Sequence, residues 1–171
     1  SDARPHDVNS KDKIGDYLTE GETIVVQITR DPTGEKGAKL TLKPVLPASN
    51  LVFTPNQPKL KISHQILDPK ERDRLKNIMG HKKTDVHGFI IRTSAQKSTA
   101  EEIIKEAIRL ELEWNEIQRN INSVSPPRTI RQSIPITQKL LIDHGRMHLK
   151  YLLTDDPETY TQLKAFTIRE M

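Results

Sequence analysis

The chain has 171 residues and contains no cysteine. Disulfide bonds and cysteine-ligated zinc are therefore excluded within this stretch, and the composition is typical of a reducing compartment. Long apolar runs are also missing, since none approaches the roughly 20 residues that a membrane-spanning helix needs. The first residues lack the basic and then apolar pattern of a signal peptide. These absences predict a soluble, cytoplasmic protein without a membrane span.

Aromatic residues are scarce, at 4% of the chain, and the excess of basic residues is small. Lys and Arg number 27 against 23 acidic residues, which gives a net charge of +4. A net charge of this size favours a polyanionic partner only weakly. Proteins that bind single strands unaided stack several bases on aromatic rings. Any RNA surface here is therefore expected to be mainly electrostatic or incomplete.

Two β-branched or alternating segments, residues 23–30 and 38–44, predict a β-hairpin. The loop between them, residues 31–37, contains a proline and two glycines and presents Arg30 and Lys36 to solvent. It lacks the motif of a nucleotide-binding phosphate loop. The sequence leaves two interpretations open, an ordinary solvated turn and a basic tip that contacts phosphates. Because an isolated hairpin is only marginally stable, it must pack on later residues or belong to a larger sheet.

The middle of the chain predicts a short strand, two helices and a strand between them. The short strand covers residues 51–53. Asp68 before a proline predicts the start of the first helix, which Gly80 closes. Ser98 and Glu101 have the spacing of a capping box at the start of the second helix, which extends to the Ser/Pro-rich break at 123–127.

The end of the chain predicts a helix at 136–144, a strand at 148–154 and a last helix capped by Asp156. The pair His144 and His148 suggests a metal site, but Gly145 between them and the lack of a third ligand favour solvated histidines. Asp155 and Asp156 follow an apolar strand, where catalytic carboxylates often lie. The helix-capping role explains Asp156 better. No nucleophile, base and acid form a recognisable triad.

The segment 87–98 is an apolar strand that ends in Arg92 and Thr93, followed by a polar turn and a helix start. A guanidinium, a hydroxyl and backbone N–H groups in one place suit a phosphate group. A surface arginine beside a capping hydroxyl explains the same residues. From the residues alone, both interpretations remain.

Several blocks in order resemble the ribonuclease E/G family over residues 14–166. They are residues 21–28, 34–41, 51–58 and 88–93, the tryptophan-containing helix, Pro126–Pro127 and residues 152–156. The resemblance implies an α+β fold with four parts. These are a mobile lead (1–13), the end of an S1-type, OB-like RNA-binding domain (14–45), a 5′-sensor region (46–125) and the start of an RNase H-like segment (126–171).

The resemblance also implies site residues. Arg92 and Thr93 match the pair that holds the 5′-monophosphate of single-stranded RNA, and Val52 matches a residue that lines the pocket. Ala48 stands where the family has glycine, so its methyl group is expected to crowd the phosphate and loosen the pocket. Lys36 matches a basic residue of the S1-type surface, with Arg30 beside it.

The family's catalytic and metal-binding residues have no counterpart in this stretch. In the family, acidic residues hold magnesium and cysteines link subunits through zinc. The resemblance implies a larger parent enzyme that is a magnesium-dependent, homo-oligomeric endoribonuclease, and a chain that by itself binds RNA without cutting it. The alternative is a non-catalytic adaptor that uses the same fold only to bind RNA or a partner.

Overall fold

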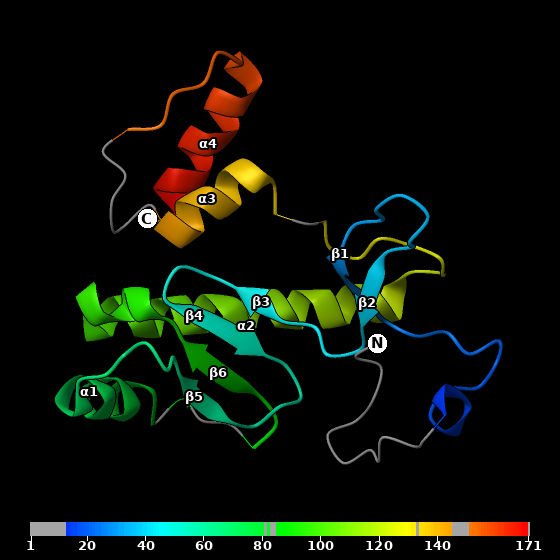
Figure 1. Ribbon diagram of the computed structural model, residues 1–171, viewed down its shortest axis with the longest axis horizontal. Helices are drawn as coiled ribbons and strands as arrows, with labels where there is room; N and C mark the ends of the chain where they lie inside the picture. The colour runs from blue at the N-terminus through cyan, green and yellow to red at the C-terminus, as the bar shows by residue number, and fades with distance from the viewer. Residues whose placement is uncertain (1–12, 81, 83–84, 133, 145–150, 171) are drawn as a thin grey trace.

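The computed structural model describes residues 13–80, 82, 85–132, 134–144 and 151–170. Its centre is a four-stranded mixed sheet (Figure 1) with the strand order β3 (Leu46–Pro47), β4 (Leu51–Thr54), β6 (Gly88–Ile91) and β5 (Leu60–Ile62). The pairs β3–β4 and β4–β6 are antiparallel, whereas β5 and β6 are parallel. Of these strands, the sequence predicted β4 and β6 and missed the two short outer ones.

Two helices, α1 (Pro69–Gly80) and α2 (Ala100–Ser123), cover one face of the sheet. Side chains alternate between the two faces of a strand, so every second residue of β4 and β6 points toward the helices. Those residues form a buried core with the apolar faces of both helices: Leu46, Ala48, Leu51, Phe53, Ile66, Leu75, Met79, Phe89, Ile91, Ala95, Ile103, Ala107, Leu110 and Trp114. Many of its large side chains, Phe53 and Phe89 among them, are completely or almost completely buried.

The starts of the two central helices differ from the prediction in one respect. Asp68 caps α1 as predicted, since its carboxylate accepts the N–H of Lys70 at 3.0 Å. The predicted capping box of Ser98 and Glu101 is wrong by one residue. Thr99 and Glu102 form the box instead, because Ser98 points inward and donates its hydroxyl to the side-chain oxygen of Asn50 at 3.0 Å.

The predicted hairpin forms, but with shorter strands, β1 (Gln27–Arg30) and β2 (Lys39–Thr41). Residues 23–26 were predicted as strand and lie outside it, because β2 offers them no partner. At the tip, the backbones of Thr33 and Lys36 exchange two hydrogen bonds around Gly34, whose positive φ of 58° suits glycine. A single 3₁₀ turn, η1 (Ile14–Asp16), precedes the hairpin.

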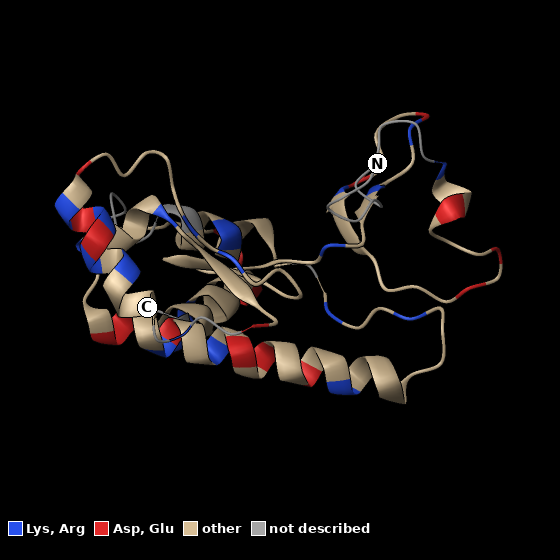
Figure 2. Cartoon of the chain, turned by 90° about the horizontal axis from the view of Figure 1, so that it is seen from below, with Lys and Arg blue, Asp and Glu red and all other residues tan. Residues whose placement is uncertain are grey.

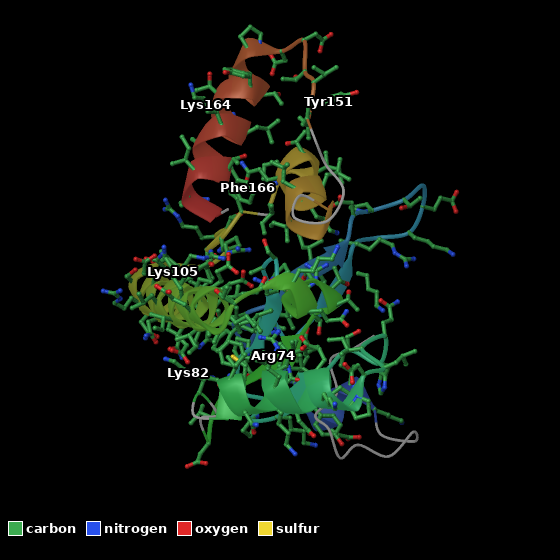
Figure 3. The ribbon with its side chains drawn as sticks, turned by 90° about the vertical axis from the view of Figure 1, so that its left-hand side faces the viewer. Arg74, Lys82, Lys105, Tyr151, Lys164 and Phe166 are labelled. Carbon is green, nitrogen blue, oxygen red and sulfur yellow. The ribbon has the colours of Figure 1, made fainter. Side chains whose placement is uncertain are left out.

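The C-terminal part consists of α3 (Ile136–His144) and α4 (Pro157–Glu170), which pack on each other through Leu141, Leu163 and Phe166. Figure 3 shows Phe166 on α4 beside α3. The strand predicted at 148–154 is not present in residues 151–154, which are irregular, and its first residues lie outside the described part. Asp156 caps α4 as predicted, accepting the N–H of Thr159 at 2.7 Å.

The predicted α+β fold class is confirmed, with two small sheets and four α-helices in the described part of the chain. The predicted boundaries of the four regions stay predictions, and the N-terminal lead lies almost wholly outside the described residues. None of the helices described is both long enough and apolar enough to cross a bilayer. The longest, α2, carries acidic and basic residues along its length (Figure 2).

Candidate phosphate-binding site

The turn before β4 and the segment after β6 meet at one corner of the central sheet. Because β4 and β6 are antiparallel with Leu51 opposite Ile91, the turn 48–50 before β4 lies beside residues 92–94 after β6. The N–H of Arg92 donates to the carbonyl oxygen of Asn50 at 2.8 Å. Its guanidinium donates to the carbonyl oxygen of Ala48, also at 2.8 Å. The hydroxyl of Ser94 donates to the carbonyl oxygen of Ser49.

Four residues predicted from the sequence are brought together at this corner. Arg92 and Thr93 are half-buried and consecutive, and Thr93 begins the 3₁₀ helix η2 (Thr93–Lys97). Val52 is the second residue of β4 and lies opposite Ile90 on β6. Ala48 is linked to Arg92 through its carbonyl oxygen.

The sequence predicted that the methyl group of Ala48 crowds a bound phosphate, and the surroundings of Ala48 show where this methyl group lies. The residue is 2% exposed and belongs to the apolar core. Its methyl group therefore packs among core side chains, while its carbonyl oxygen accepts the bond from Arg92. This packing argues against a methyl group that crowds a phosphate.

A buried carboxylate fixes the turn from below. Glu106 on α2 is 8% exposed, and its side chain accepts the N–H of Asn50 at 2.7 Å and that of Leu51 at 2.8 Å. It also accepts the side-chain amide of Asn50 at 3.3 Å. Buried carboxylates are rare unless such donors satisfy them. The geometry of the turn therefore depends on a residue more than 50 positions away.

Sequence reasoning missed Glu106, although a signal was present. Glu106 lies three residues after Ile103 and four before Leu110, both of which are buried. Residues at that spacing share a helix face. An acid on the core-facing side of an amphipathic helix indicates a buried partner for the carboxylate.

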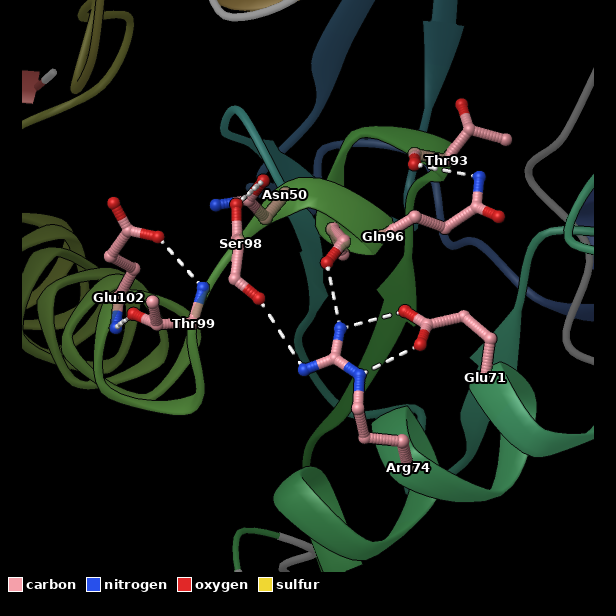
Figure 4. Close-up of polar contacts among 9 residues, drawn as sticks. Asn50, Glu71, Arg74, Thr93, Gln96, Ser98, Thr99 and Glu102 are labelled. Carbon is pink, nitrogen blue, oxygen red and sulfur yellow. Dashed lines mark hydrogen bonds and ion pairs between the residues drawn. The ribbon is translucent and has the colours of Figure 1, made fainter.

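Arg74 on α1 supports η2 from the other side, as Figure 4 shows. Its guanidinium donates to the carbonyl oxygens of Ala95 at 3.3 Å and Ser98 at 3.4 Å. It also forms a bidentate ion pair with the carboxylate of Glu71, with N···O distances of 2.7 and 2.8 Å. The hydrogen bonds from Arg74 lower the pKa of Glu71, and those to Glu71 raise the pKa of Arg74.

This arrangement brings a permanent positive charge and a hydroxyl to a corner held by backbone bonds. A guanidinium carries five N–H donors in a planar fork, and the bond to the carbonyl oxygen of Ala48 uses one of them and orients the group. That geometry suits a phosphate oxygen pair.

The described residues include no group of three or more His, Asp or Glu side chains placed to hold a metal ion. His148, one of the two histidines weighed from the sequence, lies outside the described residues. At Asp156, hydrogen bonds from the side chain and backbone of Thr159 lower the pKa, which agrees with its capping role.

Lys36 and Arg30, the two predicted RNA-contacting residues of the hairpin, lie apart from this corner. Both are exposed. Arg30 ends β1 and Lys36 closes the turn before β2, and Figure 1 shows this hairpin apart from β4 and β6. The predicted residues therefore form two separate groups.

Comparison with known proteins gives one family. A sequence model described as "Ribonuclease E/G family" matches residues 45–171. Ribonuclease G of Salmonella typhimurium (strain SL1344) is 30% identical over 154 residues, which are 90% of this chain and 32% of that protein. Ribonuclease G of Escherichia coli (strain K12) gives the same identity and coverage. Ribonuclease E of Nostoc sp. (strain PCC 7120) is 26% identical over 153 residues, 90% of this chain and 22% of that protein. The chain spans about a third of the length of the first curated relatives it matches.

Proposed function

Since the chain belongs to the ribonuclease E/G family, we propose that it binds the 5′-monophosphate end of single-stranded RNA and serves as the end-sensing part of a single-strand-specific endoribonuclease. The observation that carries this proposal is the position of Arg92, whose guanidinium is held by the carbonyl oxygen of Ala48 at 2.8 Å beside Thr93. Val52 lies on the same sheet nearby.

The chemistry of the corner supports recognition of a terminal phosphate. A 5′-monophosphate presents charged oxygens to which a guanidinium donates paired hydrogen bonds, and a threonine hydroxyl adds a further donor. A 5′-hydroxyl group has no such charge. The site would therefore prefer the phosphorylated end, and a triphosphate would bring charge that these groups do not pair.

The proposal extends to the larger protein only through the family. In the larger protein, magnesium-binding carboxylates outside the stretch present here would carry out the cleavage step. That larger protein would be a homo-oligomer that processes and degrades RNA. The isolated chain would bind RNA ends without cutting them.

The test is to titrate matched oligonucleotides with a 5′-monophosphate or a 5′-hydroxyl against the chain and its Arg92→Ala variant. We expect the variant to lose about 1.5–3 kcal/mol of binding free energy for the phosphorylated RNA, the range for a charged hydrogen bond. Binding of the hydroxyl RNA should barely change. Arg119→Ala is the matched control, because Arg119 is an exposed arginine on α2.

Equal losses for the two RNAs would contradict end sensing. Circular dichroism of each variant shows whether the fold is kept, which matters because Arg92 also bonds to the turn. Lys36→Ala should behave differently from Arg92→Ala. A lysine that contacts phosphates along the strand weakens binding of both RNAs alike and lowers the salt dependence.

A further inference from the structure

The sheet has a second face that α1 and α2 do not cover. Residues opposite each other in neighbouring strands lie on the same face, so Val52, Ile90 and Lys61 form a row across β4, β6 and β5. Val52 and Ile90 are half-buried and Lys61 is exposed. Arg92 directly follows β6 and keeps an extended backbone, with φ −86° and ψ 163°. Being two residues after Ile90, it continues the alternation of the strand and lies on the same side.

A small cleft of about 100 Å³ lies on this face. Its lining comprises Thr54, Asn56, Gln57, Pro58, Lys59, Lys61 and Ile90. Gly88 explains how the cleft is built. A Cβ atom at Gly88 would lie 2.2 Å from the carbonyl oxygen of Gln57 and 2.3 Å from that of Lys59. Only glycine lets the loop 55–59 pass this close over the sheet and form the wall of the cleft.

The loop is held in place by hydrogen bonds. The N–H of Asn56 donates to Nδ1 of His87 at 3.1 Å, and the hydroxyl of Thr54 donates to the carbonyl oxygen of Gln57 at 3.4 Å. The charged side chains that line the cleft are all positive. The lining carries two lysines, both exposed, and no carboxylate among the residues that the structure describes. Neither lysine makes an ion pair within that described part.

We propose that this lysine-lined cleft holds the first internucleotide phosphodiester of an RNA strand whose 5′-phosphate is bound at Arg92, with the ribose between them lying on Val52 and Ile90. The inference rests on the proposed function and extends it from the end of the strand to the next nucleotide. Lys61 is the residue that contacts the phosphodiester, and Lys59 adds charge.

The spacing agrees with this arrangement. Lys61 lies one strand over and two residues along from Arg92, so their Cα atoms are about 8 Å apart at standard strand dimensions. Long side chains at both positions reach neighbouring groups of one extended strand. The cleft is far smaller than the roughly 300–1,000 Å³ of pockets that enclose small molecules. It suits a backbone group better than a whole base, so binding here would not depend on base identity.

The test compares uridine 5′-monophosphate, which has no phosphodiester, with a 5′-phosphorylated uridine tetranucleotide. Dissociation constants are measured for the full chain and for Lys61→Ala, Lys61→Arg, Lys105→Ala and Arg92→Ala. Lys105, labelled in Figure 3, is an exposed lysine on α2, and α2 covers the opposite face of the sheet from Lys61. Lys61→Ala should raise the dissociation constant of the tetranucleotide about five- to tenfold, between the values for exposed ion pairs and for charged hydrogen bonds.

Lys61→Ala should leave the affinity for the mononucleotide unchanged, whereas Arg92→Ala should weaken both ligands. The slope of log K against log salt for the tetranucleotide should fall by about 0.7 in Lys61→Ala, the value for one phosphate contact on a single strand. Lys61→Arg should restore most of the affinity, and Lys105→Ala should resemble the unaltered chain.

Two results would overturn the inference. One rejects the second subsite alone, and the other rejects 5′-end binding at Arg92 as well. If Lys61→Ala binds the tetranucleotide as well as the unaltered chain while Arg92→Ala weakens both ligands, the second subsite is wrong and end binding stands. If Arg92→Ala changes neither affinity, the proposed function is rejected, and the subsite that depends on it is rejected as well.

Discussion

The central body of the molecule and the hairpin are held in different ways. In the central body, residues 46–123, a sheet and two helices bury a continuous apolar core, and Glu106 and Arg74 satisfy backbone groups around it. The hairpin contributes no residue to that core. Its large apolar side chains are exposed, with Ile28 at 60% and Leu40 at 44%. The side chain of Gln27 forms two hydrogen bonds, at 2.9 and 3.0 Å, with the backbone of Val45, the residue directly before the body.

This difference separates the two groups of predicted RNA-binding residues. Arg92 and Thr93 extend from elements whose positions the core and the polar network fix. Lys36 and Arg30 extend from a two-stranded ribbon, and such ribbons are marginally stable alone. A site on packed elements selects ligands by geometry, whereas exposed lysines on a ribbon attract polyanions with little selectivity. The proposed end recognition therefore belongs to the body.

The largest expected effect tests whether stability lies in the body. Phe53→Ala removes a completely buried ring from the core, and should lower the free energy of unfolding by about 3–5 kcal/mol. Ile28→Ala on the hairpin should change it by less than about 0.5 kcal/mol. Urea denaturation of both variants measures the two values. Similar losses in the two variants would mean that the hairpin is as much a part of the cooperative unit as the body.

The next effect concerns the carboxylate under the turn. Glu106→Ala leaves the buried N–H groups of Asn50 and Leu51 without their acceptor, and should cost about 2–4 kcal/mol of stability. Binding of 5′-phosphorylated RNA should weaken as well, because the turn that orients Arg92 loses its support. Glu116→Ala, an exposed glutamate on the same helix, is the control. Unchanged RNA affinity in a folded Glu106→Ala chain would show that the turn does not position Arg92.

The smallest effect is a pH dependence from the Glu71–Arg74 pair. The hydrogen bond from Arg74 lowers the pKa of Glu71 below its ordinary 4.5 in the folded chain. The pair therefore stabilises the fold above that ordinary value, and the contribution is lost as the pH falls through the lowered pKa. Because the pair is partly exposed, we expect only about 0.2–1 kcal/mol.

Glu71→Gln measures this contribution. The difference in unfolding free energy between the unaltered chain and the variant should be present at pH 7 and disappear in acid. Asp73→Asn on the same helix is the control, since Asp73 is exposed. A difference that persists at pH 2 would assign the effect to something other than the ion pair.

Local sequence signals predicted the helices better than the strands. Asp68 and Asp156 mark helix starts because an Asx residue before proline has few other backbone options. The outer strands β3 and β5 escaped prediction because each has only two or three residues and is defined by its neighbours. The predicted start of α2 missed by one residue, since Asn50, 48 positions earlier, draws Ser98 inward.

By itself, the sequence determined the amphipathic helices, their starts at Asp68 and Asp156, and the position of Arg92 and Thr93 at a strand end, because periodicity and capping are local properties. The α+β class was predicted from the resemblance to the family. Only the tertiary structure decided that the turn at Ala48 lies beside Arg92, that Glu106 supports it, and that Lys61 lies on the same face. Those contacts join residues about 30 to 56 positions apart. Strand register and core packing bring them together, and no local pattern encodes either.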